Sequence, residues 1–219
     1  MIYLSLSPVQ FDTPSQRASA SFQAGRSAAR QALSRIGIKD EVGQGEDKLP
    51  IWPTGIIGSI SHSELLAGAA IAQSDTYKTI GIDIEQDIEK ATRVFQRIST
   101  SIEQTTFLTD QKSFSESAFP QHLFPLLVFC AKESFFKAYN KLLPCSLGYE
   151  DISCAAPLAT PHAACTFDNL STPLWQGSST IAITPRLQNH LKTDTLTLDV
   201  IRIDTNLLMT LLCVKLSTP

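Results

Sequence analysis

The first hydrophobic pattern along the chain has helical spacing. Residues 15–37 carry small side chains that a helix tolerates. Within them, Phe22, Ala29, Leu33 and Ile36 fall within about 40° of one line when each residue advances the helix by roughly 100°. This spacing predicts a helix that buries these four residues on one face and ends at the glycine that closes the segment.

Shorter segments that follow have the character of strands. Residues 56–60 and 66–72 predict two short strands on either side of a turn at residues 61–64. Clean alternation over residues 78–85 predicts a third strand. The polar, glycine-rich residues 40–50 predict a loop between the first helix and these strands.

Helical spacing returns in the middle of the chain. Val94, Ile98 and Ile102 recur every four residues and predict a helix over residues 91–106. A longer helix is predicted over residues 126–143, because the proline that follows cannot continue it.

The remaining segments complete the expected fold class. The serine-rich residues 109–121 predict a surface excursion, and strand-like runs cover residues 179–184, 196–203 and 207–216. Strands and helices are therefore mixed without regular βαβ alternation, which favours an α+β fold.

The composition is that of a globular protein. Hydrophobic residues make up 43% and charged residues 18% of the 219 residues, which excludes a disordered chain. The formal net charge is −3, whereas a general nucleic-acid binder is usually basic. We therefore expect no nucleic-acid partner, although a net charge of −3 is compatible with one local basic pocket.

The hydropathy pattern also predicts a location. The longest apolar stretch, residues 124–131, contains a proline and is far shorter than the roughly 18 residues of a membrane span. Residues 1–8 lack the basic region of a signal peptide. We therefore expect a soluble, cytoplasmic protein with no membrane span.

Cysteines and most histidines offer little chemistry. No cysteine pair has C-x-x-C spacing, so we expect reduced thiols that serve as small hydrophobic residues. The five are Cys130, Cys145, Cys154, Cys165 and Cys213. His122, His162 and His190 lack metal-ligand spacing and are assigned no role.

The predicted strand over residues 78–85 carries a pair of carboxylates. Because side chains alternate along a strand, Asp83 and Glu85 share the face that Gly81 leaves open, about 7 Å apart. Two such head groups can converge on a hard cation. An ordinary strand with a solvated acidic face would show the same alternation.

The longest predicted helix carries charge on one face. Glu133 and Lys137 are four residues apart and meet there, and Phe129 joins the same face. Ala131 and Phe135 belong to the opposite, apolar face. A surface ion pair of little energetic consequence is the alternative interpretation.

Two further segments suit phosphate binding. A Ser61-His62 dipeptide at a strand end offers a hydroxyl, an imidazole and backbone N–H groups. Arg26 and Arg30 are also four residues apart, at the edge of the first helix's core face, where they could grip a phosphate. A structural histidine and a solvated basic edge are the corresponding alternatives.

Together, these segments resemble one family. The sequence is similar to the 4′-phosphopantetheinyl transferases that activate surfactin synthase and enterobactin synthase. The matching pieces lie within residues 25–138: Gly25-Arg26-Ser27-Ala28-Ala29-Arg30, Trp52-Pro53-x-Gly55-x-x-Gly58-Ser59-Ile60-Ser61-His62, Gly81-Ile82-Asp83-Ile84-Glu85 and Ala131-Lys132-Glu133-Ser134-x-x-Lys137-Ala138. The resemblance implies two similar α+β lobes, residues 1–78 and 79–219, related by a pseudo-twofold axis, with the active site in the cleft between them.

The resemblance also implies a reaction. The enzyme would transfer the 4′-phosphopantetheine group of coenzyme A to a serine of an apo acyl, peptidyl or aryl carrier protein and release 3′,5′-ADP. Siderophore or other secondary-metabolite assembly is the expected setting, and a monomer would suffice.

Roles for individual residues follow from the same resemblance. Asp83, Glu85 and Glu133 would hold Mg²⁺ on the pyrophosphate of coenzyme A. Glu133 would also take the serine proton, and Lys137 would stabilise the departing nucleotide. The residues expected to contact coenzyme A are Arg26, Arg30, Ser61, His62 and Lys137. Separately from the resemblance, the charges of Lys132 and Lys141 could attract an acidic carrier helix. Apolar docking is an equal alternative, because only 18% of the residues are charged.

Two other function classes fit the same residues. A Mg²⁺-dependent pyrophosphatase of nucleotide-like substrates would need these carboxylates but no protein acceptor. A module that binds coenzyme A or a carrier without turnover would need neither the base nor the ammonium group. Incubation with coenzyme A and an apo-carrier separates all three.

Overall fold

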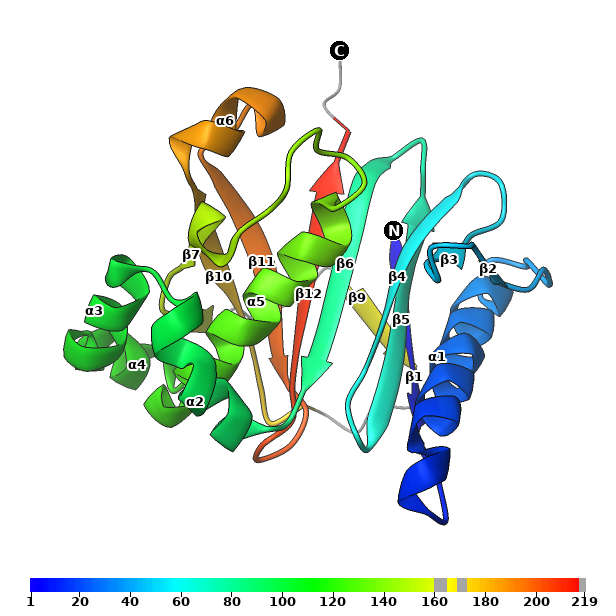
Figure 1. The fold of residues 1–219 in the computed structure, drawn as a ribbon, viewed down its shortest axis with the longest axis horizontal. Helices are drawn as coiled ribbons and strands as arrows, with labels where there is room; N and C mark the ends of the chain where they lie inside the picture. Colours follow the sequence, from blue (N-terminus) through cyan, green and yellow to red (C-terminus); the bar gives the residue numbers. More distant parts are fainter. Residues whose placement is uncertain (160–164, 169–172, 217–219) are drawn as a thin grey trace.

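One mixed sheet and one antiparallel sheet, with a small two-stranded ribbon and several helices, form the described part of the protein (Figure 1). The computed structural model describes residues 1–159, 165–168 and 173–216, and of 165–168 the backbone alone. His162 and the side chain of Cys165 therefore lie outside the described residues. Mixed sheets and helices without βαβ alternation confirm the predicted α+β class.

The first sheet has the order β4-β5-β1-β9, in which only β9 runs parallel to its neighbour. Its strands are β1 (Ile2–Pro8), β4 (Ile56–His62), β5 (Leu66–Gln73) and β9 (Cys165–Asp168). The second sheet has the order β6-β12-β11-β10-β7, and β8 also pairs with β10. Its strands are β6 (Tyr77–Glu85), β7 (Ile152–Cys154), β8 (Leu158–Ala159), β10 (Trp175–Ile183), β11 (Thr195–Arg202) and β12 (Leu208–Lys215).

The α-helices are α1 (Arg17–Ser34), α2 (Ile88–Ile98), α3 (Ser101–Thr109), α4 (Gln111–Ser117), α5 (Phe124–Tyr139) and α6 (Pro185–Leu191). One long helix packs on each of the two larger sheets, α1 on the first and α5 on the second, and α2 and α3 pack on α5 (Figure 1). Short 3₁₀ turns are η1 (Pro14–Gln16), η2 (Gln121–Leu123) and η3 (Tyr149–Asp151), and a small ribbon joins β2 (Gly43–Gln44) to β3 (Pro50–Ile51). No helix in the described ranges combines the length and apolarity needed to cross a bilayer.

Several predicted elements are confirmed with shifted ends. The predicted strand over residues 78–85 is β6, and the predicted helix over residues 126–143 is α5, which ends four residues earlier at Tyr139. Ser61 and His62 extend β4 instead of forming the predicted turn.

The predicted helix over residues 91–106 is wrong in its continuity. The helix is interrupted between α2 and α3. The Thr100 hydroxyl accepts a hydrogen bond from the backbone N–H of Glu103, and the Glu103 carboxylate accepts one from the backbone N–H of Thr100. This capping box starts a new helix. The predicted serine-rich excursion over residues 109–121 is partly wrong, since it contains α4 and buries Phe114.

The buried face of α1 also differs from the predicted one. Phe22 is 46% exposed, although Ala29 and Leu33 are buried as expected. The buried stripe consists mostly of small residues, and a Cβ on Gly25 would meet the Ile60 Cγ2 atom at 2.8 Å. The predicted apolar face, which included the large side chain of Phe22, is therefore displaced from the face that packs on the sheet.

The edges of the two sheets meet where β4 lies beside β6. The backbone N–H of Ile82 donates to the Ser59 hydroxyl at 3.1 Å, and that of Ile84 donates to the Ser61 hydroxyl at 3.2 Å. β6 is an edge strand of its sheet, so these serines satisfy N–H groups that no neighbouring strand pairs. We call this contact the seam.

Apolar packing reinforces the seam from behind. Ile82 and Ile84 belong to one buried cluster together with Leu4 and Leu6 of the first sheet. On its other side, β6 packs against α5, which also contacts β12 through a hydrogen bond of 2.7 Å between the hydroxyls of Ser134 and Thr210. Both faces of β6 are therefore buried.

Gly81 allows α5 to approach β6 closely. A Cβ at this position would lie 2.0 Å from the Ser134 backbone oxygen and 2.9 Å from the Ala138 backbone nitrogen. Because both obstacles are backbone atoms of a helix, they cannot rotate away. The sequence suggested only that Gly81 leaves space beside the acidic pair, and this space holds α5.

We predict that Gly81→Ala destabilises the protein by at least about 2 kcal/mol in urea unfolding, because α5 must move away from β6. Gly43→Ala is the matched control, since its Cβ would lie 3.4–3.9 Å from three atoms of Ile51, which is ordinary van der Waals contact. We expect the control to change stability by less than about 0.5 kcal/mol. Equal stabilities of the two variants would contradict the close packing.

Candidate active site

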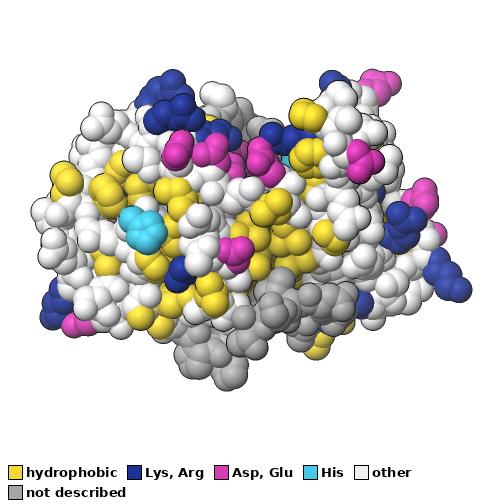
Figure 2. Space-filling view, turned by 90° about the horizontal axis from the view of Figure 1, so that it is seen from below, with side chains coloured by type: hydrophobic (Ala, Val, Ile, Leu, Met, Phe, Trp, Pro, Cys, Tyr) yellow, Lys and Arg dark blue, Asp and Glu magenta, His cyan; other side chains and the backbone are white. Residues whose placement is uncertain are grey.

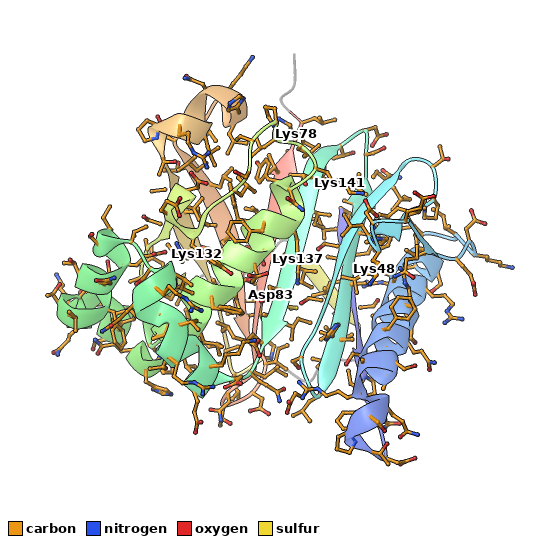
Figure 3. All side chains as sticks on the ribbon, in the orientation of Figure 1. Lys48, Lys78, Asp83, Lys132, Lys137 and Lys141 are labelled. Atoms are coloured by element: carbon orange, nitrogen blue, oxygen red, sulfur yellow. The ribbon has the colours of Figure 1, made fainter. Side chains whose placement is uncertain are left out.

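A buried ion pair lies at the centre of the seam. Asp83 of β6 is 6% exposed, and the Lys137 Nζ atom of α5 lies 2.7 Å from its Oδ1 atom (Figure 3). Ser61 of β4 donates its hydroxyl hydrogen to the same oxygen at 2.8 Å and lies 2.8 Å from Lys137 Nζ. Three elements thus bring together three predicted site residues. The alternative of a solvated acidic strand face is wrong for Asp83.

Glu133 lies one helical turn before Lys137. Burial and the negative charge of Asp83 raise the pKa of its carboxyl group, although Lys137 opposes this shift. The Glu133 Oε1 atom accepts a hydrogen bond from the Tyr149 hydroxyl at 3.3 Å. A carboxyl group with a raised pKa beside an ammonium group has the character of a general base.

Glu85 is oriented toward the start of α2. Its Oε1 atom accepts hydrogen bonds from the backbone N–H groups of Gln86 and Asp87 at 2.8 and 3.1 Å. Its Oε2 atom lies 3.5 Å from the Lys90 Nζ atom. β6 ends at Glu85, so these otherwise unpaired N–H groups take the carboxylate as their acceptor.

The three predicted metal ligands do not form a preassembled metal site. Within the described part of the chain, no three His, Cys, Asp or Glu side chains are grouped closely enough to hold an ion. Asp83, Glu85 and Glu133 each have a protein partner instead. Their donor chemistry nevertheless fits Mg²⁺, because carboxylates are hard ligands. Burial, and after it the negative charge of Asp83, raises the pKa of the Glu133 carboxyl group. The metal assignment therefore stays a prediction.

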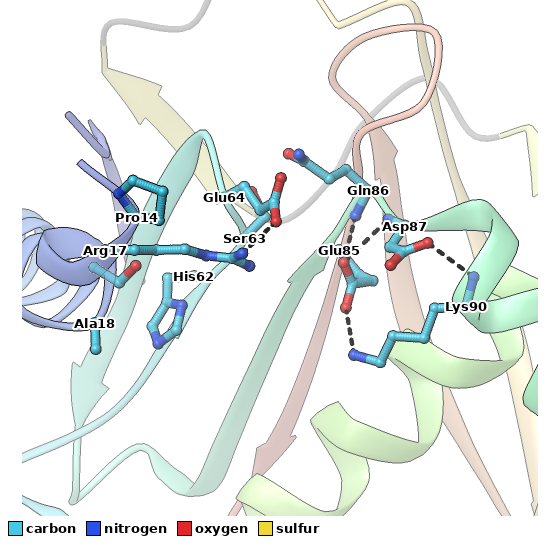
Figure 4. A pocket seen from close by; sticks show the side chains of 11 residues that line it. Pro14, Arg17, Ala18, His62, Ser63, Glu64, Glu85, Gln86, Asp87 and Lys90 are labelled. Atoms are coloured by element: carbon cyan, nitrogen blue, oxygen red, sulfur yellow. Dashed lines mark hydrogen bonds and ion pairs between the residues drawn. The ribbon is translucent and has the colours of Figure 1, made fainter. Parts of the chain in front are cut away.

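Two hollows open along the seam. One of about 600 Å³ is lined by His62, Arg17 and Ser63 on one side and by Glu85 and Lys90 on the other (Figure 4). We call the hollow lined by these five residues the charged pocket. Acidic and basic side chains also gather at the top of the face that Figure 2 shows.

The second hollow, of about 510 Å³, is lined by Glu133 and Lys137 together with apolar residues such as Trp52, Ile57 and Phe136. We call it the apolar pocket. The predicted site residues are thus divided along the seam, with Glu133 and Lys137 in the apolar pocket.

His62 lies at the mouth of the charged pocket. Partial burial lowers the pKa of its imidazole, and the Lys137 charge lowers it further. A neutral imidazole keeps one N–H donor for an anion. Arg17 lies in the same pocket and pairs with Glu64. Sequence reasoning missed Arg17, because it precedes the segment that the family resemblance covers.

Arg26 and Arg30 do not lie in the pocket with His62. Both line a smaller hollow between α1 and the residues before β2. The Arg26 guanidinium donates to the backbone oxygens of Val42 and Gly43 at 3.0 and 2.9 Å and stacks over Phe22. Arg26 thus tethers this loop. The roles of both arginines in binding coenzyme A remain predictions.

Lys132 is not available to attract a carrier protein. Its side chain is completely buried and lies 3.1 Å from the Glu103 carboxylate, while it also donates to the backbone oxygens of Tyr149 and Ile152. The prediction of a surface role for Lys132 is therefore wrong. Lys141 is exposed and pairs with Asp47. Sequence reasoning missed Glu103, and the Thr-x-x-Glu spacing of a capping box at Thr100 is the signal that marks it.

The cysteines behave as expected where the structure describes them. Among the described residues, Cys130, Cys145, Cys154 and Cys213 form no disulfide. Burial raises the pKa of the Cys130 thiol, and the nearby charge of Asp83 raises it further. Such a thiol is protonated and chemically inert at neutral pH.

Comparison with known proteins agrees with this geometry. Residues 13–72 match the model of the 4′-phosphopantetheinyl transferase N-terminal domain, and residues 79–184 match that of the 4′-phosphopantetheinyl transferase superfamily. The chain belongs to the 4′-phosphopantetheinyl transferase superfamily. Arg26, Arg30, Ser61 and His62 lie within the first match. The second match contains Asp83, Glu85, Glu133 and Lys137.

Characterised members of the superfamily are similar over part of their length. The chain is 34% identical over 131 residues to 4′-phosphopantetheinyl transferase Npt of Nocardia iowensis, which covers 59% of this chain and 55% of Npt. It is 36% identical over 118 residues to enterobactin synthase component D of Salmonella typhimurium, and this match covers 53% of this chain and 46% of that protein. For PptT of Mycobacterium tuberculosis, identity is 31% over 128 residues, with 58% and 53% covered. The chain thus spans about half the length of these relatives.

We predict that Glu133→Gln stabilises the metal-free protein at pH 8. Because the folded-state pKa of Glu133 is raised, protonation favours the folded state at low pH, and this contribution is lost as the pH rises through the folded-state pKa. A neutral glutamine avoids that loss. We expect a melting temperature about 2–4 °C higher than wild type at pH 8 and no gain at pH 4, by calorimetry.

The exposed Glu116, which pairs with Lys112 on α4, provides the matched control Glu116→Gln. We expect this control to show no gain at either pH. A Glu133→Gln variant that melts at or below the wild-type temperature at pH 8 would show that the ionised carboxylate is not strained.

Proposed function

We propose that this protein transfers the 4′-phosphopantetheine group of coenzyme A to a serine of an apo carrier protein and releases 3′,5′-ADP. The observation that carries the proposal is the seam, where a buried carboxylate, an ammonium group and a carboxyl group with a raised pKa lie together in a superfamily of such transferases. The serine oxygen forms a bond to the phosphorus of coenzyme A that carries the pantetheine arm. The bond from that phosphorus to the bridging oxygen breaks, and this oxygen leaves with 3′,5′-ADP.

Glu133 and Lys137 have complementary roles in this proposal. Glu133 accepts the serine proton, for which its raised pKa suits it. Lys137 exchanges the Asp83 carboxylate for a phosphate oxygen of the departing nucleotide, where its charge counters the negative charge that develops. Lys137 is 31% exposed and lines the apolar pocket, so its ammonium group is accessible to a ligand.

Mg²⁺ would be held by Asp83, Glu85 and Glu133 together with diphosphate oxygens. When bound, it would neutralise charge on the diphosphate. Release of Lys137 from Asp83 frees one carboxylate for the ion. Two backbone N–H groups fix the Glu85 Oε1 atom, so Oε2 would have to leave its ion pair with Lys90 to serve as the ligand.

The charged pocket suits the remaining phosphate of coenzyme A. His62 and Arg17 provide donors there, and Ser61 lies next to His62 on β4. In this proposal the lobes comprise residues 1–78 and 79–219 and are related by a pseudo-twofold axis, with the seam as the cleft between them. β9, formed by residues 165–168, nevertheless pairs with the first sheet. A monomeric state and a cytoplasmic location remain predictions.

We predict that wild-type protein, coenzyme A and Mg²⁺ add the mass of one phosphopantetheine arm to an apo-carrier in intact-mass analysis. Asp83→Asn should lower kcat/KM by about 10²-fold or more, because the ion and Lys137 lose their shared carboxylate. Asp75→Asn, in the turn between β5 and β6, is the control and should be as active as wild type.

Other outcomes would replace this function. Nucleotide release from coenzyme A without a mass change of any carrier would favour the pyrophosphatase. Carrier or coenzyme A binding without turnover would favour the binding module. Wild-type rates for Asp83→Asn would contradict the role of this carboxylate.

A separate prediction concerns the charged pocket. His62→Ala should raise the KM for coenzyme A about tenfold and leave kcat nearly unchanged, because one hydrogen bond to a charged phosphate is lost in both ground and transition states. Wild-type protein should use dephospho-coenzyme A less well, whereas His62→Ala should discriminate little between the two.

His190→Ala, on the exposed side of α6, is the control for this experiment and should retain the wild-type preference. Equal use of both substrates by the wild-type protein would show that His62 does not contact the 3′-phosphate.

A further inference from the structure

Tyr149 joins Glu133 to a rigid part of the fold. Its hydroxyl hydrogen bonds to the Glu133 Oε1 atom at 3.3 Å, and its ring packs against Phe136 with centroids 5.1 Å apart. A phenol keeps its proton at neutral pH and has only one to donate. Hydrogen bonds in catalytic sites are often long before substrate binds, so this separation is compatible with a working contact.

The backbone of Tyr149 is fixed by a buried ion pair. Lys132 donates to the Tyr149 carbonyl oxygen at 2.6 Å and to that of Ile152 at 2.8 Å. Glu103, also fully buried, holds the Lys132 ammonium group at 3.1 Å and accepts the backbone N–H of Cys154 at 2.8 Å. Because removing either charge would strand its partner in the core, this arrangement has little freedom to move.

The other end of the η3 turn is also clamped. The Asp151 carboxylate accepts the backbone N–H of Gly148 at 2.7 Å and forms a salt bridge with Arg186. The backbone N–H of Thr184 donates to the Asp151 carbonyl oxygen. Tyr149 is thus presented to Glu133 from a turn that is anchored on both sides.

We propose that Tyr149 is a positioning residue for Glu133. The Tyr149 hydroxyl holds the Glu133 carboxylate by Oε1, so that Oε2 faces the reacting serine. The inference rests on the proposed function and adds a residue outside the motifs that carry the family resemblance. The Lys132–Glu103 pair supports this role by fixing the carbonyl oxygen of the same tyrosine. Side chains that hold a catalytic group in this way commonly contribute 10–100-fold to activity.

Tyr149→Phe tests the proposal, because it removes only the hydroxyl and keeps the ring on Phe136. We expect kcat for carrier modification to fall about tenfold, with the KM for coenzyme A unchanged. Tyr139→Phe removes a hydroxyl from a buried tyrosine that packs on Phe135 of the same helix, and it should retain wild-type kcat.

A spectroscopic measurement tests the contact without relying on transfer activity. The chain has four tyrosines, so labelling with [¹³Cζ]tyrosine gives four carbon signals, and Tyr149→Phe identifies one of them. In the metal-free protein, Glu133→Gln should shift the Tyr149 signal, because a phenol that donates to a carboxylate differs from one that donates to an amide. The other three signals should stay in place.

The two measurements separate the failure of this inference from failure of the proposed function. A Tyr149 signal that Glu133→Gln leaves unmoved would overturn the inference, whether or not the wild-type protein modifies a carrier. Equal kcat values for Tyr149→Phe and the wild type would also overturn it. A shifted Tyr149 signal in a wild-type protein without transferase activity would retain the contact and reject the function.

Discussion

The meeting of two sheet edges at the seam determines where the predicted site residues of β4 and β6 come together. Ser59 and Ser61 satisfy backbone N–H groups of β6 that would otherwise lack a strand partner. The same contact places Ser61 against Asp83. Leaving buried N–H groups unpaired costs free energy. The contact that satisfies these groups at the edge of β6 therefore also positions the site residues.

The close approach of α5 completes the site. Gly81 removes the side chain that would separate α5 from β6, and one helical face then brings Glu133 and Lys137 to the carboxylate of β6. The opposite face carries Lys132 into the core, where it pairs with Glu103. Adjacent residues of one motif therefore differ in environment, since Lys132 holds surrounding backbone whereas Glu133 lines the apolar pocket.

The sequence was most informative where spacing alone determines which residues share a face. It predicted β6 and α5, because alternation and i, i+4 spacing survive in the fold, and the family followed from motifs that resemble those of its members. It did not predict the separate packing environments of Arg26 and His62, or the partner of Lys132, since these depend on contacts between distant segments. Phe22 was misplaced because small residues, which carry a weak hydrophobic signal, form the buried face of α1.

The account depends on coenzyme A placing its diphosphate at the seam, where Lys137 exchanges a carboxylate for phosphate. A crystal structure with coenzyme A and Mn²⁺, with the ion located by anomalous scattering, tests this most directly. We expect diphosphate oxygens within hydrogen-bonding distance of Lys137 Nζ and the ion coordinated by Asp83. Coenzyme A bound away from the seam, with Lys137 still paired to Asp83 and no ion on that carboxylate, would contradict the account.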